Sequence, residues 1–449
     1  MNRNQKIFES ESVWKSIFAM AVPSLITILV MLFYNMADMF FIGQLGNTSY
    51  VAAVSLVTPV FSMLMALASM IGAGGSVIIS AALGGGDRKK ATGCSAACIW
   101  SAILLGAVLA VLLNVFKGGL LTFLGAREDT IGPASTYLSV LTLGAPFMMM
   151  CTACGTLVRA EGAVQASLFG NLAGTVTNIL LDPLFILVFR WGTAGAAAAT
   201  VIGNLLGAAF YIHFILRKSA AMSLSPQEAQ QNKAVMLEVI PLGIPNAVNT
   251  LLSGFASTFS NRILAGYSTM HIASVAASGK ISMLITMVQM GICMGVQPLI
   301  AYHYGSGNKE KLNEVLKKTT LLTVIVGLCA TVFCILFRHT LIGLFLKEPE
   351  AAELGSKYVL YLIAGSAFLG FYYISSSYLQ ATKHAAQATL VSTMRQGALL
   401  IPLLFVMNHF FGFIGIGIAH IAADIIAAAG AFILFLTTHN KYLRKGAEL

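Results

Sequence analysis

The chain has 449 residues, of which 57% are hydrophobic and only 10% are charged. Soluble domains carry about 25% charged residues, so the composition excludes an ordinary soluble protein and indicates a membrane protein. The net charge of +10 would also suit a nucleic-acid partner, but Lys and Arg fall in short clusters between apolar stretches, as in loops beside membrane helices. We therefore expect the lipid bilayer as a partner and no nucleic acid.

Apolar stretches long enough to cross a bilayer recur along the whole chain. A helix needs about 20 residues to cross ~30 Å of hydrocarbon, whereas a membrane β-barrel shows alternating segments of about ten residues. The first stretch is too long for the apolar region of a signal peptide. In chain order we predict twelve transmembrane helices, at residues 14–42, 51–83, 93–116, 133–158, 164–190, 194–216, 237–263, 272–302, 315–337, 355–380, 386–409 and 413–437.

The two halves of the chain repeat each other. Residues 84–90 (GGGDRKK) match residues 305–311 (GSGNKEK), and residues 191–204 match residues 411–424. Six helices per half is an even number, so both halves have the same orientation, as in secondary transporters built from parallel repeats. The sequence predicts an all-α integral membrane protein with an N-terminal lobe at 1–216, a cytoplasmic linker at 217–235 and a C-terminal lobe at 236–449.

Basic residues also predict the orientation of the chain. Clusters of Lys and Arg lie near both termini and in every second loop, for example at residues 88–90 and 217–218. Because such residues favour the cytoplasmic side, we expect both termini in the cytoplasm.

The chain shows no enzyme motif and no motif for ATP hydrolysis. The phosphate-binding pattern GxxxxGK[ST], a metal-spaced His cluster and a nucleophile motif are all absent from the sequence. We expect a protein that is not an enzyme and needs no cofactor. Transport would then be driven by a gradient of H⁺, Na⁺ or the substrate itself.

Three acidic residues lie well inside the predicted helices, namely Asp38, Asp182 and Asp424. A charge at the centre of the bilayer costs about 2.5–3.5 kcal/mol on insertion scales, so an intramembrane acid is a candidate functional residue. For each of them a structural role, as partner of a basic residue or of a helix end, stays open.

The first half carries a set of polar residues at one depth. At 1.5 Å per residue, Asp38, Asp182 and Thr200 lie about 8, 12 and 10 Å from the outer ends of their helices. Asn178 shares a helix face with Asp182, and Pro183 frees a nearby backbone carbonyl. The predicted cation-coupling residues are Asp38, Asn178, Asp182 and Thr200, with Tyr34, Asn35 and Asn204 in support.

The ligands that these side chains offer to an ion are all oxygens, from two carboxylates and from amide and hydroxyl groups. Oxygen ligands suit a hard cation, so Asp38 and Asp182 are candidate Na⁺ ligands. Neighbouring carboxylates suit proton exchange equally well, because each raises the pKa of the other. The sequence leaves H⁺ and Na⁺ open.

The second half lacks this set, because its helices at 237–263 and 386–409 carry no acid within the membrane. His420 and Asp424 lie one helical turn apart, and they could form a second titrating pair or a hydrogen bond that satisfies both. The intramembrane cations expected here are Lys280 and Arg262. Lys280 either reaches toward the membrane surface or pairs with an acid.

Several motifs resemble the multidrug and toxin extrusion (MATE) transporters over nearly the whole chain. They are NMADMFFIGQLG (35–46), GGGDRKK and its repeat, LVRAEGA (157–163), NILLDP (178–183), VQPLIAYHYGSGN (296–308) and GIGIAHIAAD (415–424). The resemblance is to the bacterial drug-efflux and DNA-damage-inducible branch. It implies two six-helix lobes and a cation site at Asp38, Asn178, Asp182 and Thr200. A branch with acids in the helices at 237–263 and 355–380 is a poorer match.

The expected function is a monomeric antiporter in a bacterial plasma membrane. It would export lipophilic, mostly cationic, amphipathic small molecules in exchange for H⁺ or Na⁺. The alternative is a flippase for lipid-linked oligosaccharides of the same broad superfamily. A flippase would need a strongly cationic cavity for pyrophosphate, and Lys280 and Arg262 are the only cations expected to serve it in the second half.

Overall fold

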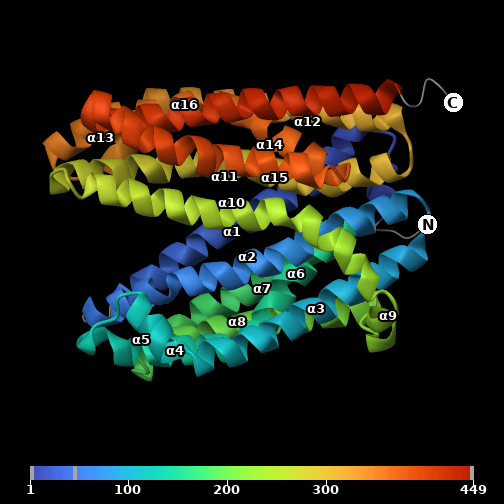
Figure 1. Ribbon diagram of the computed structural model, residues 1–449, viewed down its shortest axis with the longest axis horizontal. Coiled ribbons are helices and arrows are strands. Elements are labelled where there is room, and N and C mark those ends of the chain that lie inside the picture. Colours follow the sequence, from blue (N-terminus) through green and yellow to red (C-terminus); the bar gives the residue numbers. More distant parts are fainter. Residues whose placement is uncertain (1–4, 44–47, 445–449) are drawn as a thin grey trace. The chain divides into compact units, whose positions relative to one another are not determined.

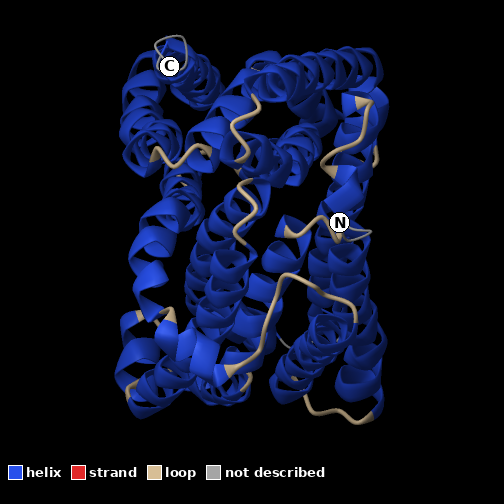
Figure 2. Ribbon diagram, turned by 90° about the vertical axis from the view of Figure 1, so that its right-hand side faces the viewer, coloured by secondary structure: helices blue, strands red, loops and turns tan. Residues whose placement is uncertain are grey.

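The computed structural model describes the backbone at residues 5–43 and 48–444, and the side chains there except those at 5, 33–40, 42, 43, 48 and 367. Every regular element in this part of the chain is helical (Figures 1 and 2). The protein is therefore an all-α membrane protein, which confirms the predicted fold class.

Contacts divide the chain into two compact units. Unit 1 takes in Met1–Glu9 and Ile26–Ala247, and unit 2 takes in Ser10–Leu25 and Val248–Leu449. Two helices contribute to both units, α1 (Val13–Gly43) and α10 (Met236–Leu264). The lobe boundaries predicted from the sequence, which assign all of α10 to the C-terminal lobe, remain a prediction.

Unit 1 holds the remaining helices that precede α10. They are η1 (Gln5–Ile7), α2 (Thr48–Gly84), α3 (Arg88–Val115), α4 (Lys117–Phe123), α5 (Glu128–Leu143), α6 (Ala145–Ala160), α7 (Val164–Pro183), η2 (Leu184–Val188), α8 (Thr193–Arg217), α9 (Pro226–Gln231) and η3 (Lys233–Val235).

Unit 2 holds the helices after α10. They are α11 (Thr269–Gly305), α12 (Lys309–Gly343), α13 (Pro349–Ala364), α14 (Ser366–Ala381), α15 (Ala385–Thr393), η4 (Met394–Leu399) and α16 (Leu400–Arg444). Both η2 and η4 are π-helices.

The described helices account for the twelve predicted membrane spans. Nine of the helices in the described residues are long and apolar enough to cross a membrane, and the bent pairs α5–α6 and α13–α14 raise the number to eleven if each pair is one span. The stretch Ala385–Arg444 is 60 residues long and breaks at Gly412, where φ is 57° and ψ is −139°. Only glycine adopts this backbone conformation readily. Because the conformation is not helical and interrupts the helix, we count that stretch as two spans.

Matching local structure confirms the internal repeat. Gly192 and Gly412 both have a φ of 57°. In the two matching loops, the side chains of Asp87 and Asn308 each accept a hydrogen bond from the backbone N–H three residues later. Such caps satisfy the first free N–H groups of a helix, so the same loop chemistry starts α3 in unit 1 and α12 in unit 2.

The first part of α10 packs closely against α2 in unit 1. A Cβ at Gly243 would lie 1.9 Å from the carbonyl oxygen of Met70, and a Cβ at Gly74 would lie 2.0 Å from that of Val239. No side chain fits at these separations, so glycine is required on both helices. This contact explains why α10 begins within unit 1.

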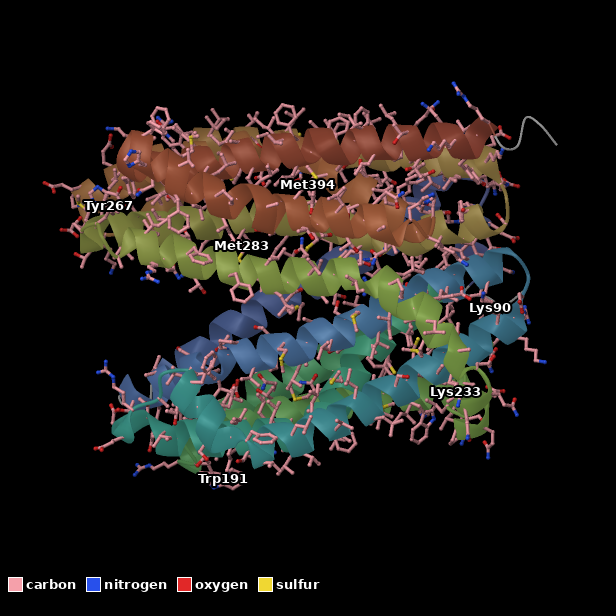
Figure 3. All side chains as sticks on the ribbon, viewed as in Figure 1. Lys90, Trp191, Lys233, Tyr267, Met283 and Met394 are labelled. Atoms are coloured by element: carbon pink, nitrogen blue, oxygen red, sulfur yellow. The ribbon has the colours of Figure 1, made fainter. Side chains whose placement is uncertain are left out.

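The segment between α8 and α10 is folded onto unit 1. The indole N–H of Trp100 in α3 donates to the carbonyl of Leu224, 3.0 Å away, and Ser225 caps α9. Lys90 and Lys233 lie at one end of unit 1, and Trp191 lies at the opposite end (Figure 3). The basic loops of unit 1 therefore share one end of its helices.

The orientation predicts which positions react from outside the cell. Single cysteines at the exposed positions Lys89, Gln230 and Glu350, in a background without the seven native cysteines, serve as probes. We expect an impermeant maleimide to label position 350 from outside and positions 89 and 230 only after permeabilisation, because basic loops stay cytoplasmic. External labelling at position 89 would refute the predicted orientation.

Candidate functional site

Three predicted site residues of unit 1 are buried where α7 meets α8. The exposed fractions of Asp182, Asn178 and Thr200 are 0%, 3% and 4%. The Asn178 amide Nδ2 donates to the Thr200 hydroxyl at 3.2 Å, and that hydroxyl donates to the carbonyl of Ala196 at 3.1 Å. The structure thus joins Asn178 to Thr200 and buries Asp182 one helical turn beyond Asn178.

The backbone is irregular next to Asp182. Pro183 has no N–H, so the carbonyl of Ile179 lacks its usual helical donor. The chain continues as the π-helix η2, in which the N–H of Phe189 donates to the carbonyl of Leu184 at 2.9 Å. Short π-helical turns are frequent at functional sites. This turn confirms that Pro183 disturbs the helix close to the acid.

An acceptor oxygen is left over at this site. Within the described chain, Oδ1 of Asn178 is buried and has no hydrogen-bond partner. A buried acceptor without a donor costs about 1–3 kcal/mol, and a bound cation would remove that cost. The described residues contain no group of three or more His, Cys, Asp or Glu that could hold a metal ion, so amide, hydroxyl and backbone oxygens would have to complete the site.

The predicted contributions from α1 stay untested. Tyr34, Asn35 and Asp38 lie in α1, but their side chains are outside the described part of the structure. Asn204 is placed, and its amide donates to the backbone carbonyl of Thr200 at 2.9 Å. Asn204 therefore supports the helix turn that carries Thr200.

Close packing of α7 and α8 holds the site together. A Cβ at Gly203 would lie 2.6 Å from the carbonyl oxygen of Gly174 and 3.1 Å from Cβ of Asn178. Both neighbours are backbone or short side chain, so neither can move aside without shifting a helix. Gly203 thus sets the separation at which Asn178 reaches Thr200.

Gly203→Ala is expected to destabilise the protein by about 1–3 kcal/mol, the usual cost of overpacking. It should also weaken ion-coupled transport, because α8 must shift away from Asn178. Chemical denaturation of the purified protein measures the first effect. Gly254→Ala in α10 is the matched control, since a Cβ there meets nothing within 4 Å. Equal stability of the two variants would contradict the packing argument.

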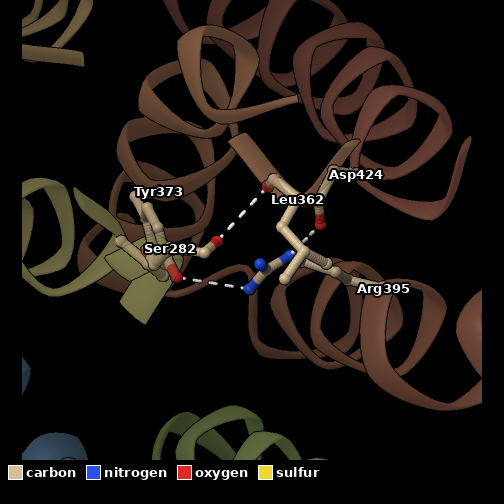
Figure 4. Close-up of polar contacts among 6 residues, drawn as sticks. Ser282, Leu362, Tyr373, Arg395 and Asp424 are labelled. Atoms are coloured by element: carbon tan, nitrogen blue, oxygen red, sulfur yellow. Dashed lines mark hydrogen bonds and ion pairs between the residues drawn. The ribbon is translucent and has the colours of Figure 1, made fainter. Parts of the chain in front are cut away.

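Unit 2 contains a buried ion pair that the sequence reasoning missed (Figure 4). Nε of Arg395 lies 2.8 Å from Oδ1 of Asp424, and the side chains are only 11% and 12% exposed. The expectation that Lys280 and Arg262 are the only intramembrane cations of this half was wrong. Arg395 is ten residues into an apolar helical stretch and could have been found by listing basic residues as well as acids within each span.

Two other candidates of the second half, His420 and Lys280, take no part in this ion pair. Among the hydrogen bonds of the described residues, Asp424 is bound by Arg395 and not by His420, so the His–Asp hydrogen bond, one of the two roles considered for this pair, is not formed. Lys280 is exposed, and its ammonium lies 5.2 Å from the centre of the Phe345 ring. Of the two roles considered for Lys280, the structure shows no pairing with an acid among the described residues.

Comparisons with known proteins agree on one family. A family model described as MatE matches residues 23–184 and 245–406, once in each repeat. A multidrug export protein, MepA, from Staphylococcus saprophyticus is 33% identical over 445 residues, which is 98% of both chains. A MepA from Staphylococcus aureus strain NCTC 8325 is 32% identical with the same coverage.

Solved structures share the fold at lower identity. A crystal structure of MATE in complex with MaL6 has a TM-score of 0.93 at 21% identity and covers 99% of this chain and 100% of its own. A transporter of the MOP superfamily from Pyrococcus furiosus, described as having a binding pocket of reverse polarity that suggests a different function, has a TM-score of 0.89 at 20% identity, covering 98% of this chain and 99% of its own.

Proposed function

Because the chain belongs to the MATE family of membrane transporters, we propose that it is a secondary active antiporter. It exports lipophilic, mostly cationic drugs in exchange for H⁺ or Na⁺. The observation that carries this proposal is the buried oxygen-rich cluster at Asp182, Asn178 and Thr200. The identity of about one third to MepA proteins over almost the full length of both chains supports drug export.

Two binding events would be linked through the conformation of the protein. Ion binding at Asp182, together with Asp38, favours one state, and drug binding favours another, so an ion entering downhill resets the carrier after release. Moving one net charge across 100 mV supplies about 2.3 kcal/mol, which supports roughly a 50-fold gradient. A one-for-one exchange of monovalent cations moves no net charge and draws on the ion gradient alone.

The substrate class follows from charge and side-chain type. Intramembrane acids attract cations, and the chain carries 27 Phe and 20 Met. Aromatic rings bind cations through their faces, and flexible thioethers adapt to ligands of many shapes.

We further propose that the protein acts as a monomer in a bacterial plasma membrane with both termini in the cytoplasm.

The flippase alternative rests on the similarity of fold, since transporters with different pockets share it. Arg395 adds one positive charge to the cationic cavity that a flippase would need. However, Asp424 neutralises that residue at 2.8 Å. A pyrophosphate group needs several positive charges in excess, so the antiporter is favoured.

Expression in a drug-pump-deficient bacterial host tests the proposal. We expect higher tolerance to ethidium and to quaternary ammonium compounds, and ion-dependent ethidium uptake into inverted vesicles. Vesicles from cells with the empty vector are the control. Unchanged tolerance despite abundant protein in the membrane, together with altered export of lipid-linked sugars, would favour the flippase instead.

A further inference from the structure

Arg159 is a cation of unit 1 that the proposed export mechanism does not use. It lies in the last turn of α6, within the motif LVRAEGA (157–163). Its Nε atom is buried without a partner, and the side chain makes no hydrogen bond or ion pair with any described residue. Glu161, the nearest acid along the chain, accepts a hydrogen bond from the hydroxyl of Ser219 instead. Because a buried charge without a partner is unfavourable, this position favours an anion.

The guanidinium of Arg159 is only partly enclosed. The residue is half-buried, and Nε is its one nitrogen among the buried polar atoms that lack a partner. Nη1 and Nη2 make no hydrogen bond with the described part of the chain either, so they reach accessible space. One edge of the planar fork is therefore free to bind a ligand.

Unit 2 satisfies the matching position without a charge. In the alignment that matches residues 84–90 with 305–311, Arg159 matches Gln380. The backbone supports this register, because the matching residues Gly162 and Lys383 both have positive φ angles, of 89° and 63°. The side-chain amide of Gln297 donates to Oε1 of Gln380. The repeat thus does not require an arginine at this place.

In unit 1 a serine replaces the partner amide. Ser76 of α2 matches Gln297, and it is buried and makes no hydrogen bond with a described residue. One turn further along α2, the hydroxyl of Ser80 donates to the carbonyl of Ala160 at 2.9 Å, so this face of α2 lies against the last turn of α6. The Ser76 hydroxyl is therefore a second free donor on the side of α2 that faces α6.

We propose that Arg159 forms a binding site for a phosphate group at the cytoplasmic end of unit 1. The basic loop at residues 88–90 follows α2 directly, so the adjoining last turn of α6 lies at the end predicted to be cytoplasmic. Basic pockets between membrane helices on that side bind anionic lipid headgroups, and the guanidinium fork matches two phosphate oxygens. The phosphate belongs to an anionic phospholipid or to a soluble phosphate. This site is independent of the coupling ion and of the exported drug.

Lipid binding to the full-length protein tests the inference. Native mass spectrometry of the protein in detergent gives its affinities for phosphatidylglycerol, which is anionic, and for phosphatidylcholine, whose choline compensates the phosphate. Arg159→Gln introduces the residue type that unit 2 has at Gln380. We expect it to bind phosphatidylglycerol about ten- to a hundredfold more weakly than the wild type, the worth of a charged hydrogen bond. Its affinity for phosphatidylcholine should change by less than about threefold.

Two further variants separate recognition from general electrostatics and from folding. Arg217 is an exposed arginine in the last turn of α8, so Arg217→Gln is the matched control and should change either affinity by less than about threefold. Arg159→Lys keeps the charge without the fork and should bind phosphatidylglycerol with intermediate affinity. It keeps the inference testable if Arg159→Gln does not fold, which thermal unfolding without lipid shows.

Inorganic phosphate distinguishes the two sources of the ligand. Competition with phosphatidylglycerol in the wild type would show that the site also takes soluble phosphates, and lipid binding without competition would show a headgroup site; either result supports the inference.

Other results would overturn the phosphate site. They are equal weakening of both lipids by Arg159→Gln, equal effects of Arg159→Gln and Arg217→Gln, and a wild type that binds neither phosphatidylglycerol nor phosphate.

Discussion

Asp182→Asn is expected to abolish ion-coupled efflux while expression stays near the wild-type level. Asn keeps much of the shape and hydrogen bonding of Asp, but it neither titrates nor carries a charge. Asp182 is fully buried beside the Asn178–Thr200 hydrogen bond, so the loss of charge removes the ion's main attraction to the site. The measurement is ethidium uptake into inverted vesicles after a step in pH or in Na⁺ concentration.

Asp38→Asn should have the same effect, because we propose that α1 and α7 share one ion. The double variant should be no worse than either single one, since residues that act as a unit are not additive. The control is the neutral double variant Arg395→Gln with Asp424→Asn in unit 2, which should still transport ethidium. The cation site would have to lie elsewhere if Asp182→Asn kept full coupled transport. The same would follow if the control variant alone lost coupled transport.

The sequence predicted the membrane spans well because their signal is local. Each span needs only a long apolar stretch, and the loops between them carry glycine, proline or charge. The two bent spans were predicted as single helices at 133–158 and 355–380, whereas the structure bends them by 55° and 42°. The bends follow Leu143 and Ala364, where the first helix of each pair ends, and hydropathy does not report a bend.

The proximity of polar side chains at the candidate site of unit 1 was predictable in part for the same reason. The helical repeat places Asn178 and Asp182 on one face, and polar atoms in an apolar span have few partners to choose from. The hydrogen bond from Asn178 to Thr200 depends on how closely α7 and α8 pack, which Gly203 and Gly174 allow. The contribution of Asp38 remains a prediction.

The Arg395–Asp424 pair could not be derived from spacing along the chain. The two residues lie 29 positions apart, in η4 and α16. His420 is closer to Asp424 in sequence and suggested a different partner. Only the packing of η4 against α16 shows that the guanidinium reaches the carboxylate first.

Arg395→Met is expected to destabilise the folded protein by about 3–5 kcal/mol, the cost of leaving a buried charge without its partner. Asp424 would keep its side chain at 12% exposure with no cation in contact. Restoring neutrality by adding Asp424→Asn should recover most of the loss, because a buried amide costs far less than a buried carboxylate. Chemical denaturation of the purified protein in mixed micelles gives the free energies of unfolding.

Lys280→Met is the matched control, since it also removes one cation from a helix of unit 2. Its ammonium is exposed and contacts the Phe345 ring rather than an acid, so the variant should change stability by less than about 1 kcal/mol. If Arg395→Met is as stable as Lys280→Met, the ion pair contributes nothing to unit 2. If the double variant is no more stable than Arg395→Met alone, the loss came from the packing of the Arg395 guanidinium against the Tyr372 ring rather than from the stranded charge. Among the described residues of unit 2, Arg395–Asp424 is the one buried ion pair between helices. The comparison of these three variants therefore separates the effect of its charge from the effect of its packing.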